Sequence, residues 1–293
     1  MNKAVSIDDR SWLASLSLSF EARADKTILK NTIRKGPLGI QRAFYPEKNG
    51  CAHVYILHPP AGIVSGDTLD LTLNMGENSH ALITTPGAAR FYRAREASPC
   101  AAEQTQNVTF YIENNAIAEY LPMETLVYTK ANAINGLDIH LKGNATYIGW
   151  EIICLGLPHV DQAFNGGYLR QSTTLFHDEK CIFHDRMSLV ANDAITSQKI
   201  ALGGNHVVGN MLLFSGAIKE QKQTDELVVL CRQAVALFES DLHIGVTQLQ
   251  KVVIVRYLGD CSEQCRKIFN AIWQVTRPFL LTQEVTTPRI WFT

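Results

Sequence analysis

The sequence predicts a mainly β protein, with a body of many strands followed by two C-terminal helices. Apolar and polar residues alternate with a period of two through much of the chain up to about residue 223. From about residue 224 the apolar residues recur at helical spacing, with one further strand between two helical segments. No Pro-, Ser- or charge-rich linker interrupts the chain. We therefore expect one domain over residues 1–293, with a β-rich body at about 13–223 and a helix-containing part at about 224–293.

The strands are indicated by alternation and by the turns between them. In residues 67–75 leucines point to one side and polar residues to the other. The same pattern occurs at residues 16–21, 108–112 and 137–141. Shorter apolar strands are expected at residues 54–57, 81–84, 125–128 and 148–153, separated by Gly-, Pro- and Asn-containing turns. This spacing predicts an extensive, mainly antiparallel β architecture.

Two helices are expected near the C-terminus. The first has an apolar stripe at helical spacing, formed by Leu227, Leu230, Cys231, Ala234 and Phe238. Thr224 is its expected N-cap. After a strand at residues 252–257, Asp260 and Glu263 resemble a capping box that begins the second helix. Pro278 is expected to end that helix.

The charge composition excludes several classes of protein. The 293 residues include 27 Lys and Arg and 28 Asp and Glu, which excludes a protein that binds nucleic acid mainly through a positive field. Only 19% of residues are charged, against about 25% in typical domains, which favours contacts with other proteins. No apolar stretch approaches the roughly 20 residues that span a membrane, and no secretory signal is apparent. With seven scattered cysteines, we expect a cytoplasmic protein with reduced thiols and no membrane partner.

The common motifs of enzymes are missing. The chain has no Walker A loop, HExxH, GxSxG or EF-hand motif. Two His-Asp pairs, His177-Asp178 and His184-Asp185, are expected in solvated turns at the ends of hairpin strands rather than at a metal or proton site.

Two further pairs have the residue types of metal ligands. Cys51 and His53 share one face of a strand, and Cys261 and Cys265 share one face of a helix. A structural zinc site normally has four ligands, and neither pair has visible third and fourth partners. The sequence therefore predicts no tight metal site.

Three short segments are the most distinctive. Residues 58–67 form a rigid loop in which His58, Pro59, Pro60, Gly62 and Gly66 precede Asp67 at the start of a strand. Residues 84–93 place a turn, Thr84-Thr85-Pro86-Gly87, before Phe91, Tyr92 and Arg93, residue types that favour interfaces. In residues 119–124, Glu124 lies in an apolar setting where a carboxylate needs a partner. Hydrogen bonding at a turn or strand end is the alternative role for Asp67 and Glu124.

Taken in order, these segments resemble the UreD (UreH) family of urease accessory proteins. The resemblance extends from about residue 13 to the C-terminus and includes Gly36-Pro37-Leu38, residues 41–47, His58-Pro59-Pro60, Gly66-Asp67, Thr84-Thr85-Pro86-Gly87, Phe91-Tyr92-Arg93, Leu121-Pro122, Glu124, Arg277-Pro278 and residues 288–291. Met123 and Leu157 stand where the family more often has Gln and Arg.

The resemblance implies a non-enzymatic scaffold in nickel-urease maturation. Such a protein binds apo-urease and a UreF-like helical protein, which recruits a UreG-like GTPase that binds the GTP. It helps to deliver nickel to the urease active site, through an internal tunnel. The implied fold is a β-helix-like stack of strands with two C-terminal helices. No tightly bound cofactor is expected, since nickel is in transit.

A nickel path needs weak oxygen or imidazole ligands that release the ion. The candidate lining residues are Asp67 and Glu124, with His58 as a helper. The structural residues of the family motifs are Pro59, Pro60, Gly62, Gly66, Thr84, Thr85, Pro86 and Gly87. The candidate partner contacts are Phe91, Tyr92, Arg93, Arg277, Arg289 and Trp291, with packing as the alternative for the last three. Two alternative functions remain: a β-helix carbohydrate-active hydrolase that uses Asp67 and Glu124, and a carbohydrate-binding β module.

Overall fold

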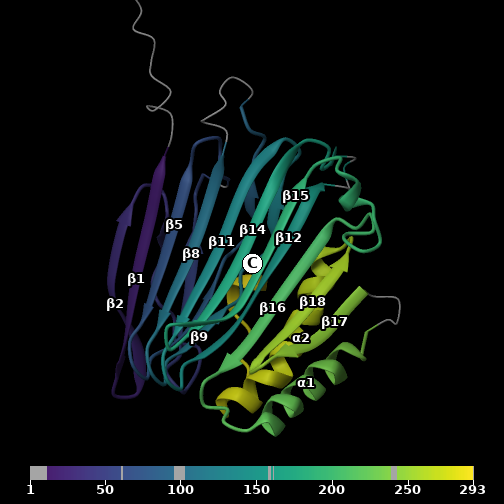
Figure 1. The fold of residues 1–293 in the computed structure, drawn as a ribbon. Helices are drawn as coiled ribbons and strands as arrows, with labels where there is room; N and C mark the ends of the chain where they lie inside the picture. Colours follow the sequence, from purple (N-terminus) through teal and green to yellow (C-terminus); the bar gives the residue numbers. More distant parts are fainter. Residues whose placement is uncertain are drawn as a thin grey trace, which may run out of the picture.

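Two β-sheets lie face to face, and two C-terminal helices pack on the outer face of the second sheet (Figure 1). The computed structural model of the chain describes residues 12–60, 62–95, 103–157, 160, 162–238 and 243–292. The predicted class, mainly β with two C-terminal helices, is confirmed.

The first sheet has seven strands in the described residues. Their order is β15 (Lys180–Val190), β14 (Gly167–His177), β11 (Ala131–Leu141), β8 (Gln104–Ile112), β5 (Thr68–Met75), β1 (Leu13–Arg23) and β2 (Lys26–Lys35). Every second residue of β5 is buried, as the leucine alternation predicts. One face of this sheet therefore forms a core, and the other faces outward.

The second sheet has eleven strands in the same described ranges. Its main path is β17 (His243–Leu249), β18 (Val252–Gly259), β16 (Val207–Ser215), β12 (Thr146–Leu157), β9 (Ile117–Tyr120), β6 (His80–Thr84), β4 (Ala52–Leu57) and β3 (Gly39–Ile40). The short strands β7 (Ala89–Phe91), β10 (Thr125–Val127) and β13 (Gln162–Ala163) join it near β12. Strands β4 and β6 are almost completely buried because both of their faces are covered.

The expectation of mainly antiparallel pairing is wrong for the middle of both sheets. From β4 to β12 the chain winds as a coil, and its longer strands belong alternately to the second and the first sheet. Each of these strands therefore pairs with the strand at the same position in the next turn of the coil. Successive coils run in the same direction, which makes these pairs parallel. Antiparallel hairpins remain at the edges, for example β1 with β2 and β14 with β15. The observed winding matches the β-helix-like stack that the family resemblance implies.

Both predicted helices are present, with different ends. Helix α1 (Gln221–Val235) begins at a capping box formed by Glu220 and Gln223, so Thr224 lies inside the helix and is buried. Helix α2 (Ser262–Leu281) has Cys261 at its N-cap. It continues past Pro278 and ends at Thr282, which adopts a left-handed conformation with φ 56°. None of the described helices is long and apolar enough to cross a membrane.

The hydrophobic core has two layers, separated by the second sheet. The layer between the sheets contains Val54, Ala81 and Ala118. The layer under the helices contains Leu82 and the inward stripe of α2. The central strands of the second sheet thus carry two buried faces, and each face holds its own group of polar residues.

Candidate functional site: a row of cavities between the sheets

A ladder of amide side chains crosses the inner face of the first sheet. Gln106, Asn135 and Gln171 lie on the neighbouring strands β8, β11 and β14, and Asn135 is in register with both other residues. Gln106 Nε2 donates to Asn135 Oδ1 at 3.0 Å, and Asn135 Nδ2 donates to Gln171 Oε1 at 2.8 Å. Polar side chains buried in a hydrophobic sandwich need such partners. We call these three residues the amide ladder.

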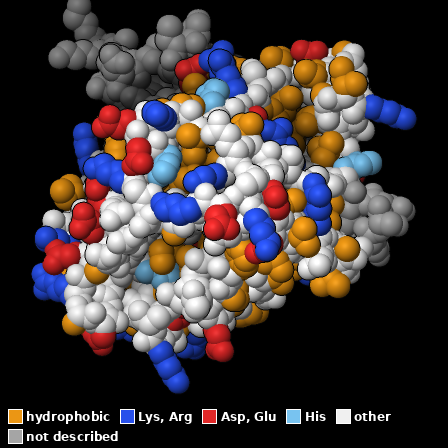
Figure 2. All heavy atoms as spheres, turned by 60° about the horizontal axis from the view of Figure 1, so that its bottom comes forward, with side chains coloured by type: hydrophobic (Ala, Val, Ile, Leu, Met, Phe, Trp, Pro, Cys, Tyr) orange, Lys and Arg blue, Asp and Glu red, His pale blue; other side chains and the backbone are white. Residues whose placement is uncertain are grey.

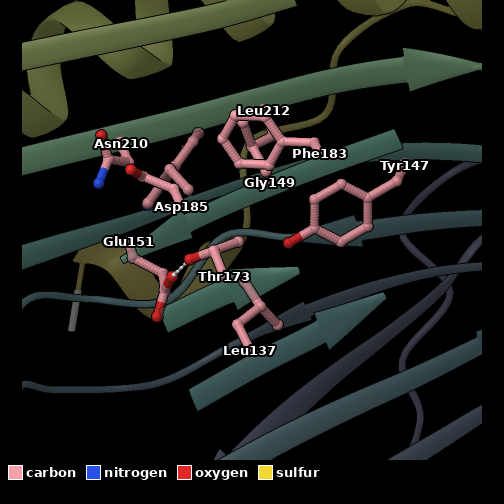
Figure 3. Close-up of a pocket in the computed structure, with 10 residues that line it drawn as sticks. Leu137, Tyr147, Gly149, Glu151, Thr173, Phe183, Asp185, Asn210 and Leu212 are labelled. Atoms are coloured by element: carbon pink, nitrogen blue, oxygen red, sulfur yellow. Dashed lines mark hydrogen bonds between the residues drawn. The ribbon is translucent and has the colours of Figure 1, made fainter. Parts of the chain in front are cut away.

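A carboxylate from the second sheet meets this ladder. Glu151 of β12 accepts a hydrogen bond from Asn135 Nδ2 at 3.0 Å. It accepts a second from Thr173 Oγ1 at 2.9 Å, which Figure 3 shows as a dashed line. Burial raises the pKa of Glu151, while hydrogen bonds from Gln171, Thr173 and Asn135 act in the opposite direction. Its hydrogen-bond partners Asn135 and Thr173 are neutral, so neither of them balances a charge on this carboxyl group.

Four cavities form a row that passes Glu151. The first, of about 240 Å³, is lined by His58 and Gln106, among others. The second, of about 60 Å³, shares Gln106 with the first and also reaches Glu151. The third, of about 10 Å³, shares Glu151 with the second and reaches Asp185. Asp185 also lines the fourth, an open groove of about 610 Å³. Neighbouring cavities therefore share walls along the whole row.

The third cavity is the narrowest point of the row. About 10 Å³ is close to the minimum that holds one water molecule. Oxygen atoms surround this point, from Glu151, Thr173, Asp185 and the amide of Asn210 (Figure 3). The hydroxyl of Tyr147 points toward Thr173 and is buried without a hydrogen-bond partner. An ion at this point would have to exchange most of its water for protein oxygens.

An ion pair stands where the narrow cavity meets the groove. Asp185 of β15 pairs with Arg256 of β18 at 3.0 Å, and both residues line the groove. The expectation that His184-Asp185 ends a hairpin strand is wrong, since both residues lie inside β15. His177 does end β14, and Asp178 follows it in the turn.

The three predicted lining residues have different surroundings. His58 lines the first cavity, and burial lowers its pKa while the charge of Asp67 opposes this shift. Asp67 accepts backbone hydrogen bonds from Trp12 at 3.0 Å and Val64 at 3.3 Å, which is the alternative strand-end role. Glu124 lies near Cys154, which belongs to the core layer under the helices. Burial, together with the charge of Glu124, raises the pKa of the Cys154 thiol to about 12. Neither Asp67 nor Glu124 lines any of these four cavities.

The family-motif loops form the walls of the first cavity. Thr85, Pro86 and Gly87 line it directly. Thr85 Oγ1 also accepts a hydrogen bond from the backbone of Met123 at 2.9 Å. At Gly62, an added Cβ would lie 2.2 Å from the ring of Tyr92, so glycine allows these two segments to pack closely. Pro59 and Pro60 lie in an exposed turn, and Gly66 has a φ of +87°.

Two expected partner contacts require correction. Phe91 and Arg277 are both 0% exposed, so they pack inside the chain and present nothing to a partner. Trp291 is half-buried, and its Nε1 donates to Thr84 Oγ1 at 2.9 Å. Arg93 and Arg289 are exposed, as a partner contact requires, while Tyr92 is half-buried.

The sequence analysis missed Glu151 and the amide ladder, and it assigned Asp185 to a solvated turn rather than to a cavity wall. Glu151 lies within the apolar run at residues 148–153, where a single carboxylate is costly unless it is hydrogen-bonded or protonated. A carboxylate inside an apolar strand is therefore the sequence signal that could have identified Glu151. The ladder carried no comparable signal, because amides are common on the exposed face of a strand.

The fold and the site together define a β-sheet scaffold that contains a row of cavities with a few polar side chains in largely apolar walls. The family model for the UreD urease accessory protein matches residues 13–292, which is almost the whole described chain. The chain belongs to the UreD urease accessory protein family. The resemblance seen in the sequence motifs is thereby confirmed.

Several relatives are similar over nearly their full length. The urease accessory protein UreD of Psychromonas ingrahamii is 41% identical over 290 residues, covering 96% of this chain and 94% of the relative. The corresponding protein of Marinomonas sp. is 38% identical, covering 96% and 90%. Urease accessory protein UreD 2 of Brucella anthropi is 36% identical, covering 96% and 98%. Membership in a family of accessory proteins agrees with the expectation that the chain is not an enzyme.

Proposed function

We propose that this chain helps to mature urease by passing nickel along the row of cavities toward the apo-urease active site. The observation that supports this proposal is the continuous sharing of walls from His58 through Glu151 to Asp185. In this proposal the chain is bound to apo-urease and to UreF-like and UreG-like accessory proteins, and the UreG-like partner binds the GTP.

The chemistry of the lining suits transit better than storage. Burial lowers the pKa of His58, which favours the neutral imidazole that binds divalent nickel. Farther along, the ion meets a carboxylate, hydroxyls and amides, which are weak oxygen ligands. Selective passage requires binding that replaces hydration water but still allows release. Glu151 is a carboxyl group at the narrowest point that pairs with no cation, and because burial raises its pKa, a passing nickel ion would displace its proton and bind the carboxylate.

The surface fits a scaffold with protein partners. On the face drawn in Figure 2, positive and negative side chains are intermixed, with hydrophobic side chains between them. The C-terminal helices expose Val229 (49%), Val275 (39%) and Phe279 (36%). We assign these surfaces to partner contact, together with Arg93 and Arg289. The six described cysteines are free, which suits a cytoplasmic setting.

Two substitutions in the narrow cavity test the proposal. Glu151→Gln removes the charge but keeps the size, and Glu226→Gln on the exposed face of α1 is the matched control. Thr173→Phe fills the narrow cavity, whereas Thr173→Val keeps its volume and removes only the hydroxyl. Each variant is co-expressed with urease and the other accessory proteins. Pull-down reports assembly, and metal analysis of the purified urease reports delivered nickel.

We expect Glu151→Gln and Thr173→Phe to lower the nickel content and activity of urease several-fold with assembly intact. Glu226→Gln should give the nickel content of the wild type. Thr173→Val should give a nickel content between those of the wild type and Thr173→Phe. Full nickel loading by both cavity variants in assembled complexes would show that nickel does not use this row. It would leave the family role in urease maturation in place.

A further inference from the structure

Tyr147, Gly149 and Glu151 lie on one face of strand β12. Side chains alternate along a strand, so all three residues face the layer between the sheets, in whose core Tyr147 packs. The intervening residues Ile148 and Trp150 belong to the layer under the helices. Tyr147 and Glu151 therefore stand on either side of Gly149, and all three line the same narrow cavity.

Glycine at position 149 allows the tyrosine ring to lie along the strand. A Cβ at Gly149 would lie 2.3 Å from the hydroxyl oxygen of Tyr147 and 2.6 Å from the ring carbon that carries it. Residues four apart in a strand are separated by about 13 Å, and the ring spans the first part of this distance. The hydroxyl of Tyr147 thus reaches over Gly149 and points toward Thr173, whose own hydroxyl donates to Glu151 at 2.9 Å (Figure 3).

The ring of Tyr147 is held in place from the first sheet. Phe110 of β8 meets it edge to face, with the ring centroids 5.7 Å apart and the ring planes at 73°. Tyr147 is 0% exposed, so its ring is surrounded by the core. The apolar body of this side chain packs as a core residue, while its polar end points into the cavity.

Packing does not account for the hydroxyl of Tyr147. This hydroxyl is buried without a hydrogen-bond partner. An unpaired buried hydroxyl is destabilising, and phenylalanine would supply the same ring without that cost. The cavity in front of the hydroxyl is about the size of one water molecule, and oxygen atoms of Glu151, Thr173 and Asp185 surround it. A ligand that enters this cavity explains the tyrosine better than packing does.

A cation is the ligand that suits this cavity. Its polar lining consists of carboxyl, amide and hydroxyl groups, which include those of Glu151, Asn210 and Thr173. Carboxylate and carbonyl oxygens are ligands for divalent cations. A tyrosine hydroxyl is neutral near pH 7 and can accept as well as donate. Tyr147 would therefore add an oxygen ligand without adding a charge that holds the ion in place.

We propose that the hydroxyl of Tyr147 is a further oxygen ligand for the divalent cation that passes the narrow cavity, and that Gly149 positions it. This inference rests on the proposed function, because it assigns a new residue to the same row of cavities. An ion at the narrowest point then meets the hydroxyl and the carboxyl group of β12 on one side and the Thr173 hydroxyl of β14 on the other. Together these oxygens replace part of its hydration shell.

Tyr147→Phe tests this assignment because it keeps the ring and removes only the hydroxyl. Tyr55→Phe is the matched control, since Tyr55 is also buried and lines none of the four cavities. The hydroxyl of Tyr55 has a hydrogen-bond partner in the backbone of Ile290. Each variant is co-expressed with urease and the other accessory proteins at limiting nickel. Pull-down reports assembly, metal analysis of the urease reports delivered nickel, and thermal unfolding of the chain gives its melting temperature.

The two variants should differ in opposite directions. We expect Tyr147→Phe to lower the nickel content of urease about 2–10-fold with assembly intact, as the loss of one neutral polar contact implies. Its melting temperature should be unchanged or about 2–4 °C higher, because an unpaired buried hydroxyl is removed. Tyr55→Phe should give the nickel content of the wild type with a lower melting temperature, because it loses a hydrogen bond. A merely structural hydroxyl cannot reduce delivery in a chain that is at least as stable as the wild type.

Unchanged nickel content in Tyr147→Phe would overturn the proposal, and so would an increase, which would make the hydroxyl only an obstacle. A reduced nickel content that accompanies a lower melting temperature would also overturn it, since a folding defect has that effect. Glu151→Gln and Thr173→Phe are measured in the same experiment. If they reduce delivery while Tyr147→Phe does not, the row of cavities stands and only the role of Tyr147 fails. If all three variants load urease fully, both proposals fail.

Discussion

Replacing Arg277 with Met tests whether a buried ion network holds helix α2 on the second sheet. Arg277 is 0% exposed, and its Nη2 donates to Glu47 at 2.9 and 2.7 Å. Its Nε lies 3.0 Å from both carboxylate oxygens of Glu119, and its Nη1 donates to the backbone carbonyl of Glu284. One side chain thus joins the loop before β4, strand β9 and the C-terminal segment.

The magnitude follows from what the substitution leaves behind. Methionine fills much of the volume but leaves Glu47 and Glu119 buried without their shared cation. Breaking a buried pair by removing one partner costs about 3–5 kcal/mol, because the remaining charge stays desolvated. We therefore expect Arg277→Met to lower the free energy of unfolding by about 3–5 kcal/mol. Arg277→Lys should lose less, since it keeps the charge but not the planar fork that reaches both carboxylates.

The assay is equilibrium unfolding in urea, followed by tryptophan fluorescence and circular dichroism. Trp273 reports directly on the network, because its Nε1 donates to Glu119 at 2.6 Å. Lys267→Met is the matched control on the same helix. It removes an exposed i,i+4 ion pair with Glu263, which water screens, so its loss should change stability far less than the loss of Arg277. If Arg277→Met costs less than about 1 kcal/mol, the network does not hold the helix in place and the reasoning from burial is wrong.

Two other predictions concern pH and packing. Because the pKa of Glu47 falls from its ordinary 4.5 to about 2 on folding, its stabilisation is complete above about pH 4.5 and is lost as the pH falls toward 2. Unfolding measured from pH 6 to 2.5 should therefore depend less steeply on pH in Glu47→Gln, and an unchanged slope would contradict the assignment. Gly62→Ala should destabilise the chain by about 1–3 kcal/mol, since its Cβ would meet the Tyr92 ring. Gly87→Ala, with nothing within 4 Å, should change stability by less than about 0.5 kcal/mol, and equal losses in thermal unfolding would refute the packing argument.

Alternation in the sequence predicted strands and their buried faces but not the direction of pairing. The leucines of β5 face inward as expected. Alternation has the same period in parallel and antiparallel strands, so it cannot show which strand is the neighbour. That choice depends on contacts a full coil apart, such as β5 with β8, and no local residue pattern encodes them. The family motifs supplied the missing information about winding.

The sites were less predictable than the strands for a related reason. His58 and the loop at residues 84–87 were found because rigid Pro- and Gly-containing segments are visible in the sequence. Glu151 and Arg277 are single charges within apolar stretches, and their partners come from distant strands. A charge in such a stretch shows that compensation is required, but only the fold shows what supplies it.

The second sheet explains how one chain can hold two polar systems without interference. Its central strands alternate, so one set of residues faces the amide ladder and Glu151, while the other faces α2 and Arg277. The first system has one carboxylate among neutral amides and hydroxyls, an environment from which a cation can leave. The second pairs the carboxylates of Glu47 and Glu119 with Arg277, and these buried ion pairs hold helix α2 on the sheet. Because the sheet backbone separates the two systems, Glu151→Gln should alter nickel delivery while lowering the free energy of unfolding by only about 1 kcal/mol, whereas Arg277→Met should lower it by about 3–5 kcal/mol. A loss in Glu151→Gln as large as that in Arg277→Met would mean that the two faces act as a single unit.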